Sequence, residues 1–284
     1  MLKNTLENKE DGEIQDQLNF YRAQAEKANL EYKKDFTEIA SSTKRIYSMD
    51  LQKLIILPII PQSKSAIFTS RLVVLNLTFA TLSKQSKNNS FCLLWHKALG
   101  GHKAESIVDA LLEVIRKERD VSHFVFWADN CTSQNKNWVL NSSLITEVNR
   151  SDVPHEIVIR YLTKGHTHMS ADGIHGNIEQ KILRSRNIYD FQELTELVNN
   201  SRKNVEDDYK ELDFLQKKKH CPSTFTSKTL NMRGISSDKK AIILKNILPL
   251  MPENRKFFWQ SLPDSETSLD LVDHEQMDAI DSNI

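Results

Sequence analysis

The chain has 284 residues, of which 39% are apolar and 27% are charged, so its length and composition fit one large domain or one domain with appendages. It contains no run of about 18 apolar residues, and its first residues lack the apolar stretch of a secretory signal, so we expect no membrane partner. Its three cysteines show no CxxC pairing, which argues against a disulfide framework and a cysteine zinc site. These features predict a nuclear or cytoplasmic protein.

Positive and negative charges balance at 38 each, but they are unevenly distributed along the chain. Residues 264–284 hold seven acidic residues and no lysine or arginine. We therefore expect an acidic disordered tail behind a mildly basic body. A basic body suits a polyanion such as DNA, although an ordinary solvated surface explains it equally well.

The first predicted element is a helix at residues 13–40. Its apolar residues recur at steps of three or four: Ile14, Leu18, Tyr21, Ala25, Ala28, Tyr32, Phe36 and Ile39. Two interpretations remain open. The helix either lies on the main domain or forms a coiled-coil arm through which the chain makes a homo-oligomer.

Strand and helix patterns then alternate between residues 45 and 186. They predict strands at 45–51, 71–82 and 91–99, a helix at 103–119, a strand at 123–128, a helix at 135–149, a strand at 156–163 and a helix at 172–186. Three antiparallel strands followed by alternating strands and helices indicate a mixed sheet with helices on both faces. We therefore predict an α/β fold with an RNase H-like, five-stranded mixed sheet at 45–186.

The remaining patterns are helical and predict a C-terminal subdomain at residues 187–263. Asp190 and Glu193 fit a capping box that opens a helix. A second helix is expected through residues 205–215. Ser236 and Ser237 precede a third, which has an apolar period and ends before Pro252.

Two acidic residues at strand ends carry the chemical argument. Asp50 lies in the first predicted strand and Asp129 closes the fourth, and these strands are neighbours in an RNase H-like sheet. Two carboxylates in contact repel each other unless a cation neutralises them. Mg²⁺ or Mn²⁺ does this with oxygen ligands and can also activate a nucleophile toward a phosphodiester. Singly, each acid could equally be a surface or turn residue.

A third ligand is expected from the helix that follows the fifth strand. Asp172 and Glu179 stand seven residues apart, with His175 between them, so all three share one helical face. Asp172 could instead only cap the helix, and Glu179 could only face solvent. The sequence leaves the choice between Asp172 and Glu179 open and gives His175 a supporting role.

Amide side chains surround the second acid. Asn130 and Gln134 could contact phosphate or orient water, or could cap the next helix. For Asn135 we favour the capping role.

The turn Gly165-His166-Thr167-His168 permits a different function. A GHTH turn also occurs in calcineurin-like metallophosphoesterases, and imidazoles two residues apart can bind a transition metal. The other motifs of those enzymes are missing here. His166 and His168 could also simply pack beside the acidic site.

Four segments together resemble a family of uncharacterised, transposon-associated animal proteins with a DDE-transposase-like domain, over about residues 15–262. The segments are YSMDLQKLIILP at 47–58, FVFWADNCTSQNKNW at 124–138, GHTHMSADGIHGNIE at 165–179 and GISSDKKAIILKNILPLMP at 234–252. The resemblance implies that Asp50, Asp129 and either Asp172 or Glu179 bind Mg²⁺ or Mn²⁺ for DNA strand cleavage.

This chain departs from that family's pattern in two places. The family has an acidic Trp-Asp-Glu segment where this chain has Trp95-His96-Lys97. Its longer members also have a cysteine-rich region upstream of the first helix, which is missing in this sequence. We therefore expect a transposase-derived nuclease-like domain that is a degenerate or domesticated copy. The alternatives are a non-catalytic nucleic-acid-binding or assembly module and a metallophosphoesterase that uses the GHTH turn.

Overall fold

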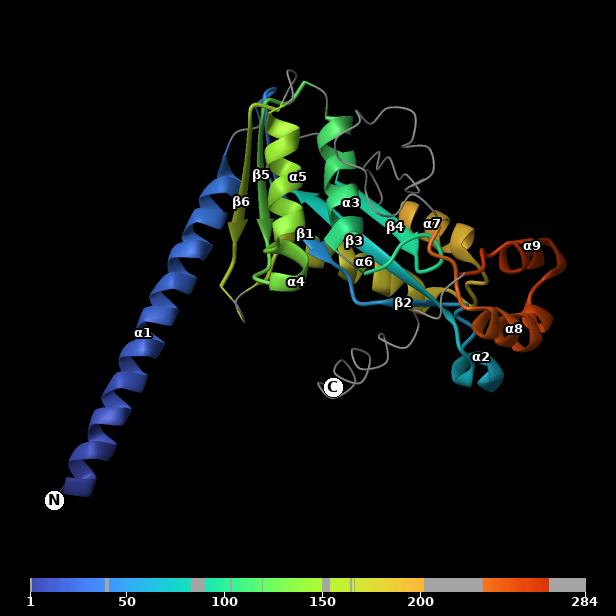
Figure 1. Cartoon of the computed structure of the whole chain (residues 1–284), viewed down its shortest axis with the longest axis horizontal. Helices are drawn as coiled ribbons and strands as arrows, with labels where there is room; N and C mark the ends of the chain where they lie inside the picture. The colour runs from blue at the N-terminus through green and yellow to red at the C-terminus, as the bar shows by residue number, and fades with distance from the viewer. Residues whose placement is uncertain are drawn as a thin grey trace.

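The protein has an α/β fold with one mixed, six-stranded open sheet and helices on both of its faces (Figure 1). The fold is known from a computed structural model that describes residues 2–38, 41–82, 90–102, 104–118, 120–149, 154–163, 165, 167–201 and 232–265. The predicted acidic tail beyond residue 265, the predicted helix at 205–215 and His166 lie outside these ranges.

The sheet is built around its first strand. The strands are β1 (Lys44–Leu51), β2 (Ile55–Leu57), β3 (Leu72–Thr81), β4 (Phe91–His96), β5 (His123–Ala128) and β6 (Glu156–Tyr161). β1 pairs antiparallel with β3 and parallel with β5; β4 extends the sheet beyond β3, and β6 extends it beyond β5. The five strands that the sequence predicts are all present, and the expected contact between the first and fourth of them is confirmed.

The sixth strand, β2, continues β1 after an interruption. Leu51 pairs with Leu77 and Ile55 pairs with Val74. The chain therefore advances four residues from β1 to β2 while β3 advances only three. One extra residue between paired positions is a β-bulge, which bends the strand and increases its twist. Sequence patterns did not reveal β2 because it has only three residues.

Two helices cover one face of the sheet (Figure 1). α3 (Ala104–Lys117) and α5 (Trp138–Val148) pack there over the apolar side chains of β1, β3, β4 and β5. Four aromatic rings, those of Tyr47, Phe79, Phe124 and Phe126, stack or meet edge to face in this layer. Because burial of apolar area contributes roughly 25 cal/mol per Å², these large buried rings contribute much of the stabilising free energy of this layer.

The opposite face is covered by α6 (Ser170–Arg184) and by the C-terminal helices. These are α7 (Phe191–Asn199), α8 (Ser237–Asn246), the 3₁₀ turns η2 (Leu248–Leu250) and η3 (Glu253–Arg255), and α9 (Lys256–Gln260). They form one apolar cluster with α2 (Lys64–Phe68), β2, β3 and β4, so their core is continuous with that of the sheet. The predicted caps are confirmed: Asp190 accepts the backbone N–H of Glu193, and Ser236 accepts that of Lys239.

Helix α1 (Leu2–Thr37) lies on the domain at its C-terminal end and extends beyond the sheet at its N-terminal end (Figure 1). It begins earlier than predicted because the helix continues through Gly12. Tyr32 and Phe36 pack against the sheet, whereas Ile14 and Phe20 are exposed. Within the described residues, none of the helices combines the length and the hydropathy that a membrane crossing needs.

A buried carboxylate joins α1 to the sheet. Asp35 is 4% exposed and accepts hydrogen bonds from Trp127 Nε1 at 2.8 Å and from Arg160 at 2.5 Å. The Arg160 guanidinium also lies over the Trp127 ring. A carboxylate that is paired and hydrogen-bonded in this way offsets the cost of its own burial.

We expect Asp35→Ala to lower the free energy of unfolding by about 2 kcal/mol, because Trp127 and Arg160 lose their shared acceptor. Urea unfolding measures the change. Glu31→Ala removes an exposed acid from the same helix and should change stability by less than about 0.5 kcal/mol. Equal stability of the two variants would show that the Asp35 contacts contribute nothing.

Candidate metal centre

Strand alternation directs Asp50 toward helix α6. Tyr47 and Met49 of β1 point into the cluster under α3 and α5, so Ser48 and Asp50 point to the other face. There the Ser48 hydroxyl accepts the backbone N–H of Ala171 at 3.1 Å, which holds the first turn of α6 against β1. The side chain of Asp50 is 24% exposed.

The first turn of α6 supplies the second carboxylate. Asp172 accepts the backbone N–H of Met169, the residue before the helix, at 2.7 Å. This contact and the positive end of the helix dipole both favour a negative charge. The sequence allowed Asp172 to be the N-cap itself, but the N-cap is Met169, and Asp172 caps it from the third helical position. This contact does not prevent the Asp172 side chain, 37% exposed, from also facing Asp50.

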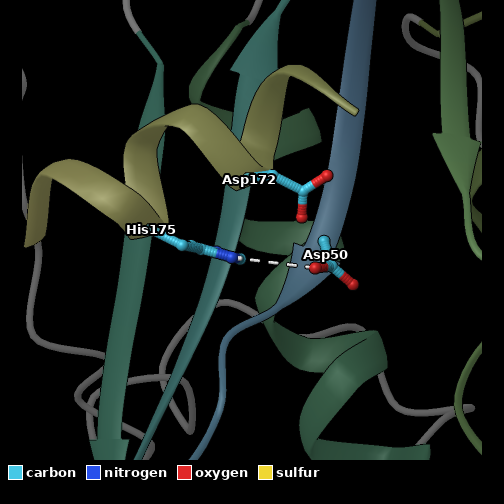
Figure 2. Close-up of side chains that lie close together, drawn as sticks. All are labelled: Asp50, Asp172 and His175. Carbon is cyan, nitrogen blue, oxygen red and sulfur yellow. Dashed lines mark ion pairs between the residues drawn. The ribbon is translucent and has the colours of Figure 1, made fainter. Parts of the chain in front are cut away.

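His175 lies almost one turn after Asp172 and completes the group (Figure 2). One ligand atom from each of Asp50, Asp172 and His175 lies within 4.8 Å of the other two. His175 Nδ1 is 3.7 Å from Asp50 Oδ2, which is longer than a hydrogen bond. The imidazole is 9% exposed, and its Nε2 is buried without a hydrogen-bond partner among the described residues. Two carboxylates and an imidazole are a donor set that binds divalent cations.

Burial and like charge determine the protonation of these groups. Burial, then Asp172 and then Asp129, raise the pKa of Asp50 to about 7, against a smaller opposing effect of the Leu51 backbone N–H. Burial lowers the pKa of His175 to about 4, although Asp172 opposes this shift. The imidazole is therefore neutral at pH 7 and keeps a lone pair for a cation. As the pH falls, Asp50 is protonated before His175 becomes charged, so their 3.7 Å contact is not an ion pair at any pH.

Asp129 lies beside this group but outside it. Met49 of β1 is level with Ala128 of β5, so Asp129 directly follows the strand next to Asp50. It is near enough to raise the pKa of Asp50. However, its carboxylate accepts the side-chain amide of Asn135 and is not among the three grouped ligands.

Among the other predicted site residues that the structure describes, His168 lies next to Asp172, and Glu179 lies outside the group. Glu179 is exposed and is absent from the group. His168 is 95% exposed, and its Nδ1 lies 3.2 Å from Asp172 Oδ2. Asn130 is exposed, and the Gln134 backbone carbonyl accepts the side chain of Asn137.

One predicted role is wrong. Asn135 does not cap the helix; the cap is Asn137, whose side-chain oxygen accepts the Leu140 N–H at 2.9 Å. The predicted single helix is two, α4 (Thr132–Asn135) and α5. Asn135 ends the first of them with its side chain on Asp129.

Sequence reasoning missed a polar layer beneath α6. Asn76 on β3 donates to Gln52 at 2.8 Å, and Gln52 donates to the backbone carbonyl of His175 at 3.5 Å. Both side chains are almost fully buried. Together with Ser48 they fix the position of α6 over β1. The available signal was the alternation of polar residues within otherwise apolar strands.

A family model described as "Domain of unknown function (DUF7869)" matches residues 74–239, more than half of the chain. The match begins inside β3, so it includes Asp129, Asp172 and His175, whereas Asp50 precedes it. No curated protein and no solved structure matches the chain. The chain therefore belongs to the DUF7869 family of domains of unknown function.

Proposed function

We propose that this protein is a divalent-metal-dependent nuclease-like domain with an RNase H-like fold that cleaves DNA phosphodiesters. The observation that carries the proposal is the meeting of Asp50, Asp172 and His175 at one end of the central strand, with Asp129 on the adjacent strand. Carboxylates from several elements that converge in this way suit a cation that contacts phosphate.

The arrangement of strands supports the fold assignment. β3 and β4 are antiparallel to their neighbours, β1 and β5 are parallel partners, and helices cover both faces. The RNase H-like hypothesis requires this order if β1 and β2 are counted as one bulged strand. It also requires acids at the ends of β1 and β5, where Asp50 and Asp129 lie.

Each residue at this end of the sheet has its own role in the proposed reaction. A bound divalent ion would activate water, or a 3′-hydroxyl, and stabilise negative charge on the phosphate. Asp50 and Asp172 would hold that ion. Asp129 adds negative potential next to Asp50, and Asn135 fixes the direction of its carboxylate. His175 is neutral at pH 7, so it adds a nitrogen donor without adding positive charge.

The function is tested by Mn²⁺-dependent nicking of supercoiled duplex DNA. We expect wild-type protein to nick with Mn²⁺ and not with EDTA, and Asp129→Asn to be at least about tenfold slower. Asp120→Asn changes an exposed acid in the same way and should leave the rate unaltered. Equal rates for wild type and Asp129→Asn would reject the proposal. DNA binding without cleavage under any metal would favour the non-catalytic module instead.

A further inference from the structure

We propose that the site holds its ion through nitrogen as well as oxygen, with His175 as a direct ligand beside Asp50 and Asp172. Such a site selects first-row transition ions such as Co²⁺ or Mn²⁺ over Mg²⁺. The inference rests on the proposed function in placing a divalent ion here. Its test measures binding rather than cleavage, so the two can fail separately.

The distances fit a single ion. Two ligand atoms that share one ion lie no more than about 4.2 Å apart, which is twice a metal–ligand bond of about 2.1 Å. His175 Nδ1 and Asp50 Oδ2, at 3.7 Å, already meet this condition. The full set lies within 4.8 Å, so adjustments of a few tenths of an ångström bring all three atoms within reach of one cation.

The state of His175 favours ligation. Its imidazole is nine-tenths buried, and within the described chain Nε2 has no hydrogen-bond partner and Nδ1 faces a carboxylate at more than hydrogen-bond length. A cation bound at Nδ1, between the ring and Asp50, gives that nitrogen a partner at bonding distance, which Asp50 at 3.7 Å does not provide. A purely structural histidine would be expected to have a hydrogen bond.

The position of His175 is also fixed before any ion binds. Gln52 donates to the His175 backbone carbonyl, and Ser48 accepts from Ala171 one turn earlier. Ser48 lies in β1 with Asp50, and Gln52 follows directly after the end of β1. The three ligands are therefore held by one strand–helix contact, as a preorganised site requires.

The chemical class of the ion follows from the donor set. Mg²⁺ favours oxygen ligands in near-ideal octahedral geometry and keeps most of its waters. Imidazole suits transition ions, and their affinities rise from Mn²⁺ through Co²⁺ toward Cu²⁺. One imidazole with two carboxylates should therefore bind Co²⁺ more tightly than Mn²⁺, and Mn²⁺ more tightly than Mg²⁺.

The test is a set of calorimetric titrations of the full chain with Co²⁺, Mn²⁺ and Mg²⁺, together with pulsed electron paramagnetic resonance of the bound Mn²⁺. We expect Co²⁺ to bind at least about tenfold more tightly than Mg²⁺. We also expect the Mn²⁺ spectrum to show coupling to one imidazole nitrogen. His175→Ala should lose the coupling and weaken Co²⁺ binding at least about tenfold.

Two further variants make the test decisive. His168→Ala removes the exposed imidazole near Asp172 and should keep the nitrogen coupling. His175→Glu replaces the nitrogen by oxygen and should lower the ratio of Co²⁺ to Mg²⁺ affinity about tenfold, which a merely structural role of His175 does not predict. Thermal unfolding without metal confirms that each variant is folded.

Three results would overturn the inference: equal Co²⁺ and Mg²⁺ affinities in the wild type, no nitrogen coupling, or coupling that disappears in His168→Ala and persists in His175→Ala. Cleavage supported equally by Mg²⁺ without nitrogen coupling would leave the nuclease standing and reject this inference. Nitrogen-coupled binding without any cleavage would support this inference and reject the nuclease proposal.

Discussion

Asp172→Asn is expected to lower the rate of Mn²⁺-dependent DNA nicking by at least about a hundredfold, whereas Glu179→Gln should change it less than about threefold. The difference follows from position on α6. Asp172 lies in the first turn and faces Asp50, while Glu179 is exposed about two turns further along, roughly 10 Å away at 1.5 Å per residue. Each substitution removes one negative charge and conserves shape, so Glu179→Gln is the matched control.

The Asp172→Asn variant separates chemistry from folding. An asparagine oxygen can still accept the backbone N–H of Met169, so the start of α6 should remain capped. Urea unfolding should therefore show a change in stability below about 1 kcal/mol. Loss of nicking in Glu179→Gln with retention in Asp172→Asn would assign the third acid to Glu179 and contradict the geometry.

Asp50→Asn is expected to make the metal-free protein more stable at pH 8, by roughly 3 kcal/mol, because it removes a buried charge that Asp172 and Asp129 repel. The pKa of Asp50 is about 7 in the folded protein, above its ordinary value of 3.8. Between these values the folded state binds more protons than the unfolded state. Stability contributed by Asp50 therefore falls as pH rises from about 4 to 7 and stays low above 7.

The advantage of Asp50→Asn should consequently shrink toward zero as the pH falls to about 4. His175 acts in the opposite direction in the wild type. Its pKa is lowered from 6.5 to about 4, so protonation of the unfolded state reduces stability as the pH falls through this range. Comparison of variant with wild type at each pH isolates the Asp50 contribution.

Urea unfolding in EDTA at pH 4.5, 6 and 8 measures this prediction, with Asp120→Asn as the exposed control. Added Mn²⁺ should reverse the ranking, because only the wild type gains the free energy of ion binding. A difference that does not depend on pH, or a less stable Asp50→Asn at pH 8, would mean that Asp50 is not a strained acid in the folded state.

Much of the candidate site could be predicted from residue spacing. A strand alternates faces with a period of two, so Ser48 and Asp50 had to share one face of the sheet. A helix repeats every 3.6 residues, so Asp172 and His175 had to share one side of α6. The order of elements along the chain placed the acid of the first strand beside that of the fourth. The first two are local rules of the backbone, and the third follows from the topology expected for this order of elements.

Other features depend on particular side-chain contacts. The N-cap of α5 is Asn137, while the side-chain amide of Asn135, at the end of α4, donates to Asp129. His175 was predicted to be a supporting residue, yet it is one of the three grouped side chains because α6 buries it against β1. Propensity and spacing contain no information about such partners.

The sequence by itself therefore determined the α/β architecture, the two acids at the ends of neighbouring strands and the helical face that carries Asp172, His175 and Glu179. Only the tertiary structure decided which part of that face meets Asp50. The Ser48–Ala171 and Gln52–His175 hydrogen bonds set the first turn of α6 over β1. This position along the helix axis comes from packing across 123 residues of sequence, and no local period encodes it.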